Sequence, residues 1–171
     1  LASKTISCYN GGMNTNSFPT TTVGGVTLSR LIAGTNWFLG YSHTSAAKDK
    51  FITTFQSRER IVSVLRVFFE RGVTTVLGPM SPLLRDAFAD VQQQTGVKGQ
   101  LILTPGFNVL PGGPADAEPE RVFDTCAQWG ATFCMPHQCV TDALIDRLHG
   151  VIRDIDTYTR MIRERGMVPG L

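Results

Sequence analysis

The sequence predicts an α/β protein and, within that class, a parallel (β/α)8 TIM barrel of which the chain carries about four and a half units. Apolar runs typical of buried strands alternate with longer segments of helical periodicity. Each predicted helix ends at a glycine shortly before the next apolar run, at Gly72, Gly96, Gly130 and Gly166. Such alternation of strands and helices indicates a parallel sheet.

Two layouts of a parallel sheet fit this alternation, an open doubly wound sheet and a barrel. No Gly-x-Gly-x-x-Gly segment, the usual mark of a doubly wound sheet, follows the first predicted strand. The long polar loop after that strand favours a barrel, whose functional groups lie in such loops. Because complete barrels have about 250 residues, we expect residues 18–171 to form the N-terminal part of one. A polar, glycine-rich arm is expected over residues 1–17.

Local signals predict the individual elements. Two β-prone runs around Gly24-Gly25 predict a β-hairpin, and Ser81-Pro82 has the N-cap and first-turn proline of a helix start. The predicted strands lie at about 30–35, 73–77, 100–104, 131–135 and 167–171. The predicted long helices lie at about 57–71, 81–95, 119–129 and 154–165, with shorter helices within 46–55 and 137–153, the latter capped by Thr141 or Asp142.

Composition narrows the class of protein. Hydrophobic residues make up 42% and charged residues 18%, as in ordinary globular proteins. The net charge of +2 gives no reason to expect a nucleic-acid partner, and no apolar run approaches the ~20 residues of a membrane span. The four cysteines are too few and too scattered for a disulfide scaffold, which favours a reducing, cytoplasmic environment. Assembly into a homo-oligomer stays open.

The segment from Phe18 to Thr35 resembles the opening of the aldo-keto reductases. The matching residues are Val26-Thr27-Leu28-Ser29-Arg30-Leu31 and Gly34-Thr35. The resemblance implies a hairpin that plugs the bottom of a barrel, and a reductase that uses NADP. The catalytic group of that family is largely missing, because Leu77 stands where the family has Asp and Pro105-Gly106 where it has Lys. Met80-Ser81-Pro82 stands in place of its Tyr, and only its His has a counterpart, His137.

Other segments resemble a bacterial family of barrels that has no assigned activity. These segments are Gly34-Thr-Asn-Trp37, Tyr41-Ser-His-Thr44, Met135-Pro-His-Gln-Cys139 and Thr141-Asp142. The resemblance implies a barrel and brings no reaction with it.

Candidate site residues follow from the barrel prediction, since functional groups of a barrel lie at the carboxyl ends of its strands. We predict catalytic roles for His137, His43 and Asn36, because imidazole titrates near neutral pH and suits acid–base chemistry. His137, Cys139 and His43 also form a candidate set for a divalent metal such as zinc. The predicted substrate-binding residues are Thr35, Trp37, Tyr41, Thr104 and Gln138.

Three functions fit these observations. The first is a barrel enzyme that acts on a small polar metabolite at the strand ends, with or without a divalent metal. The second is an oxidoreductase that uses NADP and has an altered catalytic group. The third is a barrel without catalytic activity that serves as a binding module.

Overall fold

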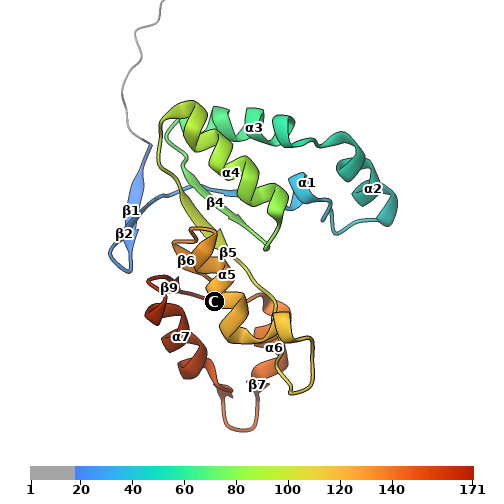
Figure 1. Cartoon of the computed structure of the whole chain (residues 1–171), viewed down its shortest axis with the longest axis vertical. Coiled ribbons are helices and arrows are strands. Elements are labelled where there is room, and N and C mark those ends of the chain that lie inside the picture. The colour runs from blue at the N-terminus through green and yellow to red at the C-terminus, as the bar shows by residue number, and fades with distance from the viewer. Residues whose placement is uncertain (1–17) are drawn as a thin grey trace, which may run out of the picture.

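A computed structural model describes residues 18–171 and shows an α/β fold around a five-stranded parallel sheet. Figure 1 shows the hairpin at one side of the sheet strands, with α3 and α4 side by side along another. The predicted arm at residues 1–17 lies outside the described residues. The sheet strands are β3 (Ile32–Gly34), β4 (Thr75–Gly78), β5 (Gln100–Leu103), β6 (Phe133–Cys134) and β9 (Val168–Pro169). The helices are α1 (Asn36–Leu39), α2 (Ala46–Phe55), α3 (Arg58–Glu70), α4 (Pro82–Thr95), α5 (Pro119–Gln128), α6 (Gln138–Leu144) and α7 (Ile155–Glu164), with a 3-10 turn at Ala115–Ala117.

The strands of the sheet follow one another in the order β3-β4-β5-β6-β9, and every neighbouring pair is parallel. A doubly wound sheet would contain a reversal of this order, and the described strands contain none. The predicted parallel sheet is therefore confirmed. The sheet is open, because β3 and β9 are not paired with each other among residues 18–171.

The two faces of the sheet carry different partners. Val76, Leu101 and Cys134 belong to the large core cluster, which also contains buried apolar residues of α3, α4, α5, α6 and α7. Ile102 and Phe133 point the other way and pack with Leu28 of the hairpin. Since successive side chains of a strand alternate between faces, the helices cover one face and the hairpin covers part of the other.

The hairpin consists of β1 (Thr20–Val23) and β2 (Val26–Ser29), as predicted, with Gly24 and Gly25 at positive φ in its turn. A buried hydrogen-bond network ties its end to the start of β4. The Ser29 amide donates to Thr75 Oγ1 over 3.1 Å, and the two hydroxyls lie 3.0 Å apart. Ser29 Oγ also accepts from the amides of Thr74 at 3.2 Å and Thr75 at 3.1 Å. This network fixes where the hairpin sits on the sheet.

The helices join the sheet through packed side chains and a few specific polar contacts. Phe107, Phe123 and Tyr158 form an aromatic cluster, with ring centroids 5.2 Å apart for the first two and 4.9 Å for Phe107 and Tyr158. Burial is the main cause that raises the pKa of Tyr158. Arg58 of α3 binds Asp90 of α4 through two hydrogen bonds of 2.6 and 2.7 Å.

Two buried cysteines, Cys126 and Cys134, lie in this core, where a free cysteine behaves as a small apolar residue. Cys126 Sγ lies 3.6 Å from Met80 Sδ. A hydrogen bond with Cys126, followed by burial, raises the pKa of the Cys134 thiol, so the thiol stays protonated. No disulfide joins the cysteines of the described part of the chain.

The segment between β6 and α7 differs from the prediction. The expected short helix is present, but it begins at Gln138 and its N-cap is His137 rather than Thr141 or Asp142. A two-residue antiparallel pair, β7 (Ile145–Asp146) with β8 (Val151–Ile152), follows it. None of the helices in residues 18–171 is long and apolar enough to cross a membrane.

The Ser29→Ala substitution removes a buried hydroxyl oxygen that accepts hydrogen bonds from two backbone amides. We expect the free energy of unfolding to fall by about 2 kcal/mol, because buried donors would lose their partner. Chemical denaturation measures the change. Ser63 is the matched control, since its hydroxyl makes an exposed contact with the Arg60 carbonyl. Ser63→Ala should change stability by less than about 0.5 kcal/mol. Equal effects of the two substitutions would contradict the role of Ser29.

Candidate functional site

The carboxyl ends of the sheet strands lie along one edge, and most of the predicted site residues follow them. Asn36 opens α1 directly after β3, and His43 lies in the loop between α1 and α2. His137 and Cys139 follow β6. Parallel pairing places these segments on one edge of the sheet, which we call the carboxyl rim.

The loop after β3 is held in a defined shape by hydrogen bonds. Asp49 Oδ1 accepts from the Ser42 amide at 2.7 Å and from the Ser42 hydroxyl at 2.6 Å. These bonds, with a smaller contribution from His43, lower the pKa of Asp49. The carboxylate therefore stays ionised near neutral pH and keeps Ser42 in place. Ser45 caps α2 by accepting from the Lys48 amide.

His43 has a left-handed backbone with φ of 56°. This conformation is uncommon for a residue with a side chain, although histidine adopts it more often than most. The Asn36 amide nitrogen lies 3.0 Å from His43 Nε2. An amide NH2 only donates, so Nε2 is the acceptor and the neutral ring carries its proton on Nδ1. Residues with side chains in this left-handed conformation gather at functional sites. His43 therefore remains a candidate for the predicted catalytic role.

His137 is held at both its backbone and its ring. Its amide donates to the Pro105 carbonyl at 2.8 Å, which connects the segment after β6 to the end of β5. The Cys139 amide donates to His137 Nδ1 at 3.3 Å, and Cys139 Sγ lies 3.1 Å from the same nitrogen. Because a backbone amide only donates, Nδ1 carries the lone pair and the neutral ring has its proton on Nε2. His137 thus presents an N–H donor from its free nitrogen.

The structure does not bring the predicted metal ligands together. The ends of β3 and β6 are separated by three strand spacings, or about 14 Å. In residues 18–171, no group of three or more His, Cys, Asp or Glu side chains is placed to hold a metal ion. Of the set His137, Cys139 and His43, the structure brings His137 and Cys139 into contact.

The predicted substrate-binding residues differ in accessibility. Thr35 is only 1% exposed, and its hydroxyl donates to the Leu77 carbonyl at 3.0 Å. A Cβ on Gly78 would clash with Thr35 Oγ1, so these strand ends are in close contact. Thr35 therefore joins the end of β3 to β4.

The other four residues of that set are accessible to different degrees. Trp37 is 55% and Tyr41 50% exposed, and Lys48 Nζ lies 4.8 Å from the centre of the Trp37 ring. Gln138 is exposed and Thr104 half-buried. All four lie on the loops or helix starts that follow strands of the sheet.

Comparisons with family models, curated proteins and solved structures give no match. The predicted site did not include Asp49 and Ser42, whose contact shapes the loop after β3.

The proton position on His137 can be measured by nitrogen NMR. At a pH where the ring is neutral, we expect His137 Nδ1 to resonate as the unprotonated nitrogen and Nε2 as the protonated one, because the Cys139 amide donates to Nδ1. Two-bond proton–nitrogen correlation spectra of labelled protein report both shifts. His149 supplies an internal comparison, since its Nδ1 lies 2.8 Å from Asp146 Oδ2 and should carry the proton. The same tautomer in both residues would contradict this geometry.

Proposed function

We propose that the chain forms part of a (β/α)8 barrel enzyme that binds a small polar metabolite at the carboxyl rim. The sequential order of the parallel strands supports a barrel, because each crossover adds a strand on the same side of the last one. The placement of the helices on one face and of the hairpin on the other also agrees with it. The sequence resemblance of residues 18–35 to the start of the aldo-keto reductases supports the same architecture.

The ligand chemistry follows from the two rim histidines. In the neutral rings, the hydrogen bonds leave His43 with a free Nδ1–H and His137 with a free Nε2–H. Each ring then offers one donor, which suits an oxygen of a carboxylate or a carbonyl. A small hydroxy acid or oxo acid is the metabolite class that fits the donor of His137.

His137 carries the proposed reaction. Its Nε2–H can donate a hydrogen bond to a substrate oxygen and so stabilise the negative charge that develops there, while the ring keeps its proton. Cys139 acts through His137, because its amide and thiol hold Nδ1 and so orient the ring. The single observation on which this rests is the pair of contacts at His137 Nδ1. Asn36 holds His43 in the same manner on the other side of the rim.

Substitution of His137 tests this proposal, because the chain has three histidines and one of them is a matched control. We expect at least one member of a panel of small hydroxy and oxo acids to bind the wild-type protein in ligand-observed NMR. His137→Ala should weaken that binding by about tenfold, as expected from loss of a hydrogen bond to a charged group. His149→Ala, in the β7–β8 turn, should bind like the wild type.

Mass spectrometry of the same mixtures then separates an enzyme from a binding module. An enzyme consumes a panel member in the wild type and consumes none with His137→Ala. A panel without any bound member, or equal binding by His137→Ala, would contradict the proposed site. Circular dichroism of each variant establishes that the fold is kept.

A further inference from the structure

A second hollow lies away from the carboxyl rim, between α4 and the end of α5. It has a volume of about 450 Å³ and is bounded by the start of β5 and the residues just before β6. This end of the sheet is the amino edge, opposite the carboxyl rim. We call this hollow the α4–α5 groove. Its volume falls within the range of about 300–1,000 Å³ that small-molecule sites have.

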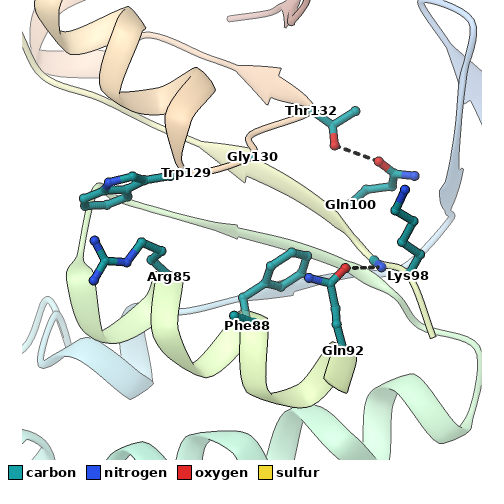
Figure 2. Close-up of a pocket in the computed structure, with 10 residues that line it drawn as sticks. Arg85, Phe88, Gln92, Lys98, Gln100, Trp129, Gly130 and Thr132 are labelled. Atoms are coloured by element: carbon teal, nitrogen blue, oxygen red, sulfur yellow. Dashed lines mark hydrogen bonds between the residues drawn. The ribbon is translucent and has the colours of Figure 1, made fainter. Parts of the chain in front are cut away.

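The groove has aromatic walls at one end. Figure 2 shows Trp129 above Arg85, with Phe88 further along α4. The guanidinium carbon of Arg85 lies 5.1 Å from the centre of the Trp129 ring. Arg85 Nε is bound to Asp86 Oδ1 at 2.7 Å, and its two terminal nitrogens have no partner within residues 18–171. A flat group against Trp129 would therefore meet unpaired guanidinium donors.

The polar lining is rich in donors. Gln92 Oε1 accepts from the Gly99 amide at 2.9 Å, and Gln100 Oε1 accepts from the Thr132 hydroxyl at 2.7 Å. The oxygen of each carboxamide thus already accepts a hydrogen bond, which leaves the two NH2 groups to bind a ligand. Figure 2 shows these contacts, with Lys98 beside Gln100 at the end of the groove away from Arg85. Among residues 18–171, the lining contains Arg85 and Lys98 as cations and no carboxylate.

We infer that the α4–α5 groove binds a small organic anion that carries a flat ring, such as an aromatic carboxylate or a nucleoside monophosphate. The ring would lie against Trp129, since aromatic stacking and contact with Arg85 both favour a flat group there. At the other end of the groove the anion would bind Lys98 and the two free carboxamide NH2 groups, because charge-assisted hydrogen bonds are the strong ones. This site is separate from the carboxyl rim and does not depend on the function proposed for it.

Fluorescence of Trp129 tests the proposal directly. The chain has two tryptophans, so Trp37→Phe leaves Trp129 as the only one. In that background we expect AMP, indole-3-carboxylate or both to bind saturably at millimolar concentration. Binding of AMP is followed by quenching of Trp129 fluorescence. Binding of indole-3-carboxylate is followed by calorimetry, because this ligand is itself fluorescent. The two ligands distinguish a phosphate from a carboxylate. Adenosine, which lacks the anion, and inorganic phosphate, which lacks the ring, should each bind at least about tenfold more weakly.

Two variants and two controls complete the test. Lys98→Ala and Arg85→Ala should each raise the Kd by about tenfold, and Lys98 is exposed, so its removal leaves the fold intact. Arg66→Ala, on the exposed side of α3, and His137→Ala, on the carboxyl rim, should bind like the parent protein. No saturable binding of either ligand, equal binding of adenosine and AMP, or unchanged binding in Lys98→Ala and Arg85→Ala would overturn the inference.

Discussion

Parallel pairing of each strand with the strand before it is the constraint on which the rest of the structure depends. A connection between adjacent parallel strands is right-handed, so a sheet that grows in one direction receives all its helices on one face. The cores agree with this rule, since Val76, Leu101 and Leu103 contact the helices and Ile102 contacts the hairpin. The same constraint places every carboxyl strand end on a single edge, and with it both rim histidines.

Two sets of polar contacts hold the ends of the sheet. At the amino edge, Ser29 joins the hairpin to β4 through buried hydrogen bonds with Thr75. At the carboxyl rim, Thr35 donates to the Leu77 carbonyl and packs against Gly78. Because both hydroxyls are buried and paired, their role is to fix neighbouring strands. The residues that can carry the chemistry of the carboxyl rim lie further along the loops, where the backbone is exposed.

Much of the architecture could be predicted from the sequence, because the signals that specify it are local. The turn at Gly24-Gly25, the cap at Ser81 and the glycines that end four helices each act over a few residues, and all are present in the structure. The start of α6 could not be predicted, since Thr141 and Asp142 have the side chains that normally cap a helix, whereas His137 occupies that position.

The site was harder to predict than the fold, because it depends on distances between separate segments. Spacing along the chain identified His43 and His137, but it gave no measure of the three strand spacings between their strands. It also selected Thr35 by residue type, although the close approach at Gly78 buries its hydroxyl. The α4–α5 groove has no sequence signal at all, since Arg85 and Trp129 come from different helical units and meet only after the strands pair.

Strand order in solution is the most direct test of the parallel, sequential sheet. Nuclear Overhauser contacts between backbone protons of labelled protein report which strands are neighbours. The structure predicts contacts that pair Val76 with Leu101 and Ile102 with Phe133 in parallel register, and it places β9 beside β6. Contacts of an antiparallel pattern, or contacts that place β3 beside β5 or β6, would contradict the shared carboxyl rim and the site proposed there.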